Sequence, residues 1–163
     1  MDQSSNQTSA SSSPLEYNFF GGFTHSIDEK GRIIIPNTYR AALGETFSIG
    51  PTRTLNGVAL YPNEVFDQMV AELNSLNPRN PAVMDYKDMF FSLSTRDMQK
   101  DAQGRILLPQ NIRKTFLEGA QEVEITGSYN CIRILDAAKA EANKKKFFSD
   151  LPNILEQLGN CDR

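Results

Sequence analysis

The chain has 163 residues, a formal net charge of −3 at pH 7, two cysteines and one histidine. This length suits one domain or two small halves that share a core, and the scarcity of histidine and cysteine predicts no catalytic triad, disulfide framework, metal site or cofactor. Because it lacks a membrane-length apolar run and a secretory signal, the sequence predicts a cytoplasmic protein that enters no membrane. We expect neither an enzyme nor a small-molecule substrate, since the sequence shows no nucleophile and base pair, phosphate loop or metal motif, and the absence of a basic surplus argues against indiscriminate nucleic-acid binding.

The N-terminal segment, residues 1–17, is rich in Ser, Gln, Asn and Thr. Its few apolar side chains cannot offset the entropy of ordering it by burial, so we predict a disordered tail. Aromatic residues follow, and Phe23, His25 and Ile27 then alternate with polar residues, which predicts a half-buried strand. We expect these aromatic side chains to lie in the core or in a subunit interface.

A turn signature follows this strand at Asp28-Glu29-Lys30-Gly31. Asp at the first position and Gly at the fourth are typical of a type I turn followed by a residue with positive φ. The carboxylate of Asp28 can accept backbone N–H groups inside the turn, and Gly31 adopts the left-handed conformation without steric cost. Pro36 then ends the returning strand and favours the start of a short helix that Gly44 closes.

The rest of the first half alternates short strands with one longer helix. Strands are predicted at residues 46–49 and 58–61, the second after an Asn-Gly turn signal. A helix is predicted from Pro62, because Val65, Phe66, Met69, Val70 and Leu73 recur at helical spacing and form one apolar face. A further helical piece at residues 84–91 leads into the second half.

The second half repeats the first at an offset of 73 residues. Between residues 28–40 and 101–113, identical residues stand at six of thirteen aligned positions: Asp28 and Asp101, Gly31 and Gly104, Arg32 and Arg105, Ile33 and Ile106, Pro36 and Pro109, Arg40 and Arg113. We therefore predict two repeats, 18–80 and 81–148, and a C-terminal tail or short helix at 149–163. Two repeats are too few for a solenoid, which favours a pseudo-twofold pair that buries its apolar faces together.

One family shares this arrangement of motifs. The sequence resembles MraZ over about residues 19–148, through Phe19-x-Gly21-x-Phe23-x-His25-x-x-Asp28-x-Lys30-Gly31-Arg32-x-x-x-Pro36 and the later Asp101-x-x-Gly104-Arg105. The resemblance implies an α+β, mainly β fold: a pseudo-twofold double swapped-hairpin (SpoVT/AbrB-like) barrel with short flanking helices. It also implies a cytoplasmic, nucleoid-associated transcription factor that forms a ring-shaped homo-oligomer. Such a factor binds short direct repeats in double-stranded promoter DNA of the division and cell-wall gene cluster.

Candidate DNA contacts are Lys30, Arg32 and Arg105 at the two turns, with Arg53 and Lys100 as further candidates. The residues interpreted as architecture are Asp28, Gly31, Pro36, Asp101, Gly104 and Pro109. Flexible cationic side chains at a turn can reach phosphates or the edges of guanine. The second turn departs from the family pattern, because Ala102 follows Asp101 where a lysine is usual.

Structural interpretations compete with each of these assignments. Arg32 can simply pair with the aspartate of its own turn, and Arg40 and Arg113 can cap carbonyls or bridge the two halves. The run Lys144-Lys145-Lys146 is interpreted as the solvated face of a helix. A second hypothesis for the whole chain is a protein-binding or assembly module of the antitoxin type, without specific DNA recognition.

Overall fold

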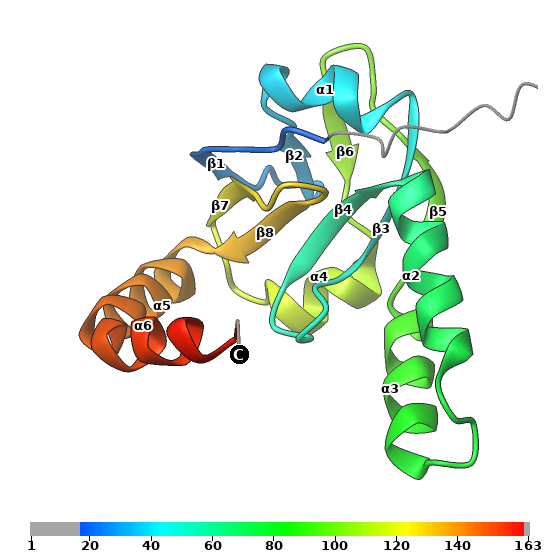
Figure 1. Cartoon of the computed structure of the whole chain (residues 1–163). Helices are drawn as coiled ribbons and strands as arrows, with labels where there is room; N and C mark the ends of the chain where they lie inside the picture. Colours follow the sequence, from blue (N-terminus) through cyan, green and yellow to red (C-terminus); the bar gives the residue numbers. More distant parts are fainter. Residues whose placement is uncertain (1–16, 162–163) are drawn as a thin grey trace, which may run out of the picture.

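The computed structural model describes residues 17–161, so the predicted disordered tail lies, apart from Tyr17, outside the described residues. Figure 1 shows the arrangement of the elements. In chain order they are β1 (Gly22–Ser26), β2 (Arg32–Ile34), α1 (Asn37–Leu43), β3 (Thr46–Pro51), β4 (Val58–Pro62), α2 (Asn63–Ser75), α3 (Pro81–Ser92), β5 (Thr95–Gln99), β6 (Arg105–Leu107), α4 (Gln110–Phe116), β7 (Glu122–Gly127), β8 (Ile132–Asp136), α5 (Ala137–Ser149) and α6 (Leu151–Asn160).

The two halves exchange strands. An antiparallel six-stranded sheet has the order β1-β7-β8-β4-β3-β5, and β2 pairs with β6 in a separate two-stranded ribbon. The first strand of each half therefore pairs with a strand of the other half, β1 with β7 and β5 with β3. The predicted turns are present, but their two arms continue into different sheets.

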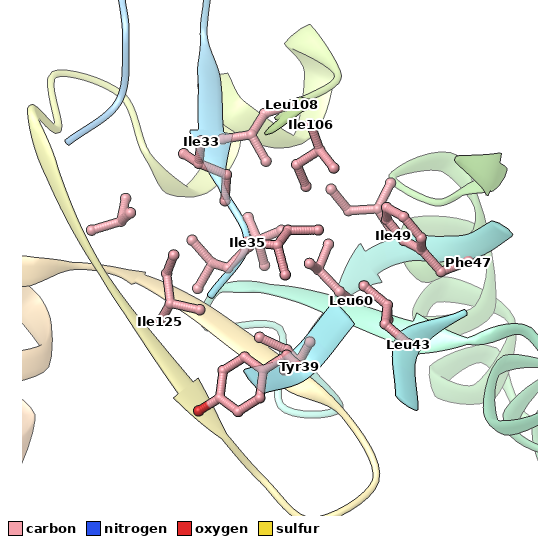
Figure 2. Packing of buried hydrophobic residues seen from close by; sticks show 14 of the residues in the cluster. Ile33, Ile35, Tyr39, Leu43, Phe47, Ile49, Leu60, Ile106, Leu108 and Ile125 are labelled. Carbon is pink, nitrogen blue, oxygen red and sulfur yellow. The ribbon is translucent and has the colours of Figure 1, made fainter. Parts of the chain in front are cut away.

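A pseudo-twofold relation runs through both sheets. In the ribbon Ile33 lies opposite Ile106, and in the large sheet Ala59 lies opposite Arg133, so residues at equivalent positions of the two halves face each other. Ile33 and Ile106 point inward with about 1% exposure and pack into a core shared by both halves, as Figure 2 shows. Neither half has a complete core of its own, because the main cluster draws residues from both.

The helices begin and end where the local sequence favours it. Pro36 directly precedes α1, Gly44 ends it with a φ of 89°, and Tyr39 and Leu43, four residues apart, turn inward. In α5 the side chain of Asp136 accepts a hydrogen bond from the amide of Ala138, as expected for an N-cap.

Helices α2 and α3 form a hairpin with a smaller core. Val65, Phe66 and Met69 of the predicted apolar face are buried, and Phe66 stacks on Phe90 of α3 with ring centroids 6.2 Å apart. Asn80 caps α3 by accepting a hydrogen bond from the amide of Ala82. Figure 1 shows this hairpin and the α5–α6 pair extending from opposite sides of the strands.

Two expectations about the fold need correction. The described strands leave the six-stranded sheet open between β1 and β5, so the predicted barrel does not close. Helices account for more of residues 17–161 than strands do, which makes the fold mixed α+β rather than mainly β. The predicted half-buried strand is present as β1, an edge strand paired with β7, where His25 and the following Ile27 are half-buried and Phe23 is 37% exposed.

Two further properties concern the part of the chain that the structure describes. None of its helices combines the length and the apolar character needed to span a membrane. Among residues 17–161, no three or more His, Cys, Asp or Glu side chains are grouped so that they could hold a metal ion.

Candidate nucleic-acid interface

The two predicted turns have nearly identical geometry. In each, the glycine amide donates to the aspartate carbonyl over 3.0 Å, from Gly31 to Asp28 and from Gly104 to Asp101. The φ angles of the two glycines are 80° and 78°, in the left-handed region that favours glycine. Oδ1 of Asp28 accepts the amides of Lys30 and Arg32, and Asp101 does the same in the second turn. The sequence-based account of the D-x-x-G pattern is therefore confirmed.

Each turn also contains an ion pair. Nε of Arg32 lies 2.7 Å from Oδ2 of Asp28, and Nε of Arg105 lies 2.8 Å from Oδ2 of Asp101. The Arg32 amide on Asp28, assisted by the Arg32 guanidinium, holds the pKa of this carboxyl below its ordinary value, and Arg105 acts likewise on the pKa of Asp101. Both aspartates therefore stay ionised at neutral pH and hold their arginines in one orientation.

The ion pair with the aspartate uses only the Nε–H group of each guanidinium. Within residues 17–161, no other hydrogen bond fixes the Nη groups of Arg32 or Arg105. About 28% of each arginine side chain remains exposed. Arg32 thus pairs through Nε with the aspartate of its own turn, as the structural interpretation predicted. Its Nη1 and Nη2 groups remain available to donate hydrogen bonds to another acceptor.

Each turn is packed against an arginine from the other half. A Cβ added at Gly31 would collide with the guanidinium of Arg113, and one added at Gly104 would collide with that of Arg40. Nε of Arg40 also donates to the carbonyl of Ile35 over 3.0 Å, and its Nη2 lies 3.5 Å from the carbonyl of Gln103. Arg40 and Arg113 therefore bridge the halves, as one of the two structural interpretations predicted.

The β2–β6 ribbon carries the turns at its two ends. Backbone hydrogen bonds extend the ribbon on both sides, from Leu108 to Gly31 and from Ile35 to Gly104. Four residue steps separate Gly31 from Ile35, which places the turns about 14 Å apart at roughly 3.4 Å per residue. The inward face holds Ile33 and Ile106, whereas the outward face holds Arg32, Ile34, Arg105 and Leu107.

The remaining candidate cations lie in different settings. Lys30 is exposed at the first turn, and its equivalent in the second turn is the neutral Gln103. Arg53 pairs with Glu72 at 3.0 Å beside α2, away from the ribbon. Nζ of Lys100 donates to the carbonyl of Gly44 over 2.6 Å and lies 5.5 Å from the Phe47 ring, and burial lowers its pKa, with Arg40 adding to the effect.

Sequence reasoning therefore grouped five cations that the fold separates. Lys30, Arg32 and Arg105 lie on the ribbon or its first turn, while Arg53 and Lys100 make contacts elsewhere. It also missed the exposed aliphatic residues Ile34 and Leu107, which share the outward face with the arginines. The signal was present in the alternation of each strand, because the residue after an inward isoleucine must point outward.

Comparisons with known proteins place the chain in a family. Residues 19–87 match the family model described as "MraZ protein, putative antitoxin-like". Proteins named "Transcriptional regulator MraZ" are similar over most of their length. The one from Finegoldia magna is 32% identical over 145 residues, which span 88% of this chain and 99% of that protein. The chain belongs to the MraZ family.

Other MraZ proteins give the same result. The one from Herpetosiphon aurantiacus is 30% identical over 141 residues, 86% of this chain and 96% of that protein. The one from Acetivibrio thermocellus is 35% identical over 125 residues, 76% of this chain and 85% of that protein. The resemblance drawn from the two motifs is thus confirmed. The MraZ family model covers the first turn and ends before the second at residues 101–105.

Proposed function

We propose that the chain is a DNA-binding transcriptional regulator and that the outward face of the β2–β6 ribbon, with its two D-x-x-G-R turns, contacts DNA. The observation that carries this proposal is the pair of guanidinium groups on one face. Each is oriented through Nε by its own aspartate and retains its Nη donors. The related MraZ proteins are named as transcriptional regulators, which supports the same conclusion.

The dimensions of the ribbon suit the major groove of DNA. That groove is about 12 Å wide and admits a two-stranded β-ribbon. A guanidinium held at its Nε edge still offers two donors, which can bind the O6 and N7 acceptors of guanine or a phosphate. We propose that Lys30, which is exposed at the end of the ribbon, contacts the phosphate backbone beside it.

An acidic chain needs more than one such contact. With a net charge of −3, one subunit would bind weakly and with strong salt dependence. Several copies in a ring would bind repeated sites with much greater avidity. We therefore include in the proposal a ring-shaped homo-oligomer and short direct repeats in the promoter of the division and cell-wall gene cluster, as the family resemblance implied.

Replacement of Arg32 by Ala tests the DNA contact. We expect the variant to bind the DNA upstream of its own gene about 5- to 150-fold more weakly, because a bidentate base contact contributes about 1–3 kcal/mol. A gel-shift titration over a range of salt concentrations, with scrambled repeats as competitor, measures both affinity and salt dependence. Arg32→Lys keeps the charge but loses the two-donor geometry, so we expect it to recover only part of the affinity.

Arg96→Ala is the matched control. Arg96 also pairs with an aspartate, Asp67 at 2.6 Å, and is half-exposed, but it lies on β5 rather than on the ribbon. Unchanged affinity and salt slope in an Arg32→Ala protein that assembles normally would refute the assignment of the site. If a protein rather than DNA co-purifies with the chain, and specific DNA binding is absent, the protein-binding hypothesis replaces the proposal.

Two helical surfaces support self-association. Helix α6 has Leu151, Ile154, Leu155 and Leu158 along one side, with Leu155 and Leu158 56% and 59% exposed. Between α2 and α3 lies a groove of about 450 Å³ lined by apolar side chains that include Leu73, Leu76, Ala82 and Val83. Residues 63–92 hold five carboxylates and two cations, whereas α5 holds four lysines and one glutamate. We infer that α5–α6 of one copy docks on α2–α3 of the next.

Complementary variants test this head-to-tail contact. We expect Leu155→Asp with Leu158→Asp, and separately Leu76→Asp with Ala82→Asp, each to abolish assembly, because a charge at the contact loses its hydration. An equimolar mixture is expected to form dimers and nothing larger, since only one intact pair of surfaces remains. Native mass spectrometry distinguishes these states. A mixture that stays monomeric, or a single variant that still dimerises, would contradict the contact.

A further inference from the structure

The outward face of the β2–β6 ribbon has two exposed aliphatic side chains that its arginines do not explain. Ile34 is 44% exposed and Leu107 is 56% exposed, whereas their neighbours Ile33 and Ile106 are about 1% exposed. These four residues alternate on three-residue strands. Each half therefore contributes one cation and one aliphatic side chain to the outward face of the ribbon.

Register places each aliphatic residue beside an arginine from the other half. Arg32 lies opposite Leu107, and Ile34 lies opposite Arg105. Directly opposed side chains have Cβ atoms about 4.5–5.5 Å apart, so each guanidinium and its aliphatic neighbour reach adjacent positions on one ligand. The pseudo-twofold relation produces this pairing twice, once at each end of the ribbon.

This pairing has a chemical counterpart in the major groove. There the C5-methyl of thymine is the one apolar group on a base edge, next to the acceptors that guanidinium groups bind. From the ribbon's register we propose that Ile34 and Leu107 contact thymine methyl groups and contribute to sequence preference. The inference rests on the proposed function, because it requires the ribbon to lie in the groove.

Removal of the methyl from the DNA tests the inference without altering the protein. Each thymine of the bound promoter fragment is replaced in turn by deoxyuridine, which lacks only the C5-methyl group, and affinity is measured by gel shift. We expect replacement at a contacted thymine to weaken binding about fourfold, the factor that corresponds to about 0.8 kcal/mol for one buried methyl-sized group. Thymines outside the footprint should have no effect.

Protein variants then assign each methyl to its side chain. With Ile34→Ser, the deoxyuridine effect should disappear at one set of positions, and with Leu107→Ser at another set. Phe20→Ser, at a residue that is 64% exposed and lies outside both the ribbon and the docking helices, is the control and should keep every effect. Thermal unfolding followed by circular dichroism, together with native mass, verifies that each variant folds and assembles like the parent chain.

The possible outcomes separate this inference from the proposed function. Specific binding in which no deoxyuridine replacement matters, or in which the effects persist in both serine variants, overturns the methyl contact and leaves DNA binding intact. If the serine variants fail to assemble but still respond to deoxyuridine replacement, Ile34 and Leu107 belong to a subunit interface. That result also overturns the methyl contact. Failure of the unmodified chain to bind the fragment overturns the proposed function and this inference together.

Discussion

Ile106→Ala is expected to lower the free energy of unfolding by about 2–5 kcal/mol, the range typical of a large aliphatic residue truncated to alanine in a packed core. Ile106 is about 1% exposed and lies opposite Ile33, where the two halves meet. A cavity there removes contacts from both halves at once. Urea unfolding followed by circular dichroism measures the change, which is expected as a shift of the midpoint.

Leu107→Ala provides the control on the same strand. Leu107 is the next residue and points outward, so its truncation should change stability by no more than about 0.5 kcal/mol. Equal losses for the two variants would mean that β6 does not bury alternate residues as described, and the assignment of an outward, ligand-facing side to the ribbon would then fail.

Gly31→Ala is expected to destabilise the chain by about 1–3 kcal/mol. Alanine in the left-handed region costs about 1–2 kcal/mol, and its Cβ would also displace the Arg113 guanidinium that packs on this turn. Because this guanidinium is the far end of a flexible side chain and can move aside, its displacement adds no more than about 1 kcal/mol. We expect the same for Gly104→Ala, against which Arg40 packs. Chemical denaturation at equilibrium is the appropriate measurement.

Gly119→Ala separates these two contributions. Gly119 has a φ of 74°, but no side chain or backbone atom of the described residues would lie within 4 Å of an added Cβ. Its replacement should therefore cost only the backbone strain, about 1–2 kcal/mol. If Gly31→Ala and Gly119→Ala are equally destabilising, the arginine contact contributes nothing measurable to stability.

Much of the local structure could be predicted because short-range chemistry determines it. The spacing of Asp28 and Gly31 predicted a turn with a capped aspartate and a positive φ, and both are present. Pro36 and Gly44 predicted the limits of α1, and the apolar spacing from Val65 predicted the buried face of α2. The duplication predicted two related halves, and the motif predicted the family.

Other features depended on which residues meet across the fold. The open sheet follows from strand exchange, because β1 and β5 each pair with one partner and become edges. Arg53 and Lys100 were predicted as candidate DNA contacts, yet Arg53 pairs with Glu72 and Lys100 donates to the carbonyl at the end of α1. Neither partner can be identified from sequence spacing, since 19 residues separate the first pair and 56 the second.

The two D-x-x-G-R stretches combine a local structure with a tertiary placement. By itself the sequence determined the turn, because Asp, Gly and the intervening amides interact within five residues. Only the tertiary structure decided that the two turns lie at opposite ends of one ribbon, that each is packed by an arginine of the other half, and that Ile34 and Leu107 share its outward face. Those arrangements arise from burying Ile33 and Ile106 together, a long-range hydrophobic contact that no local pattern encodes.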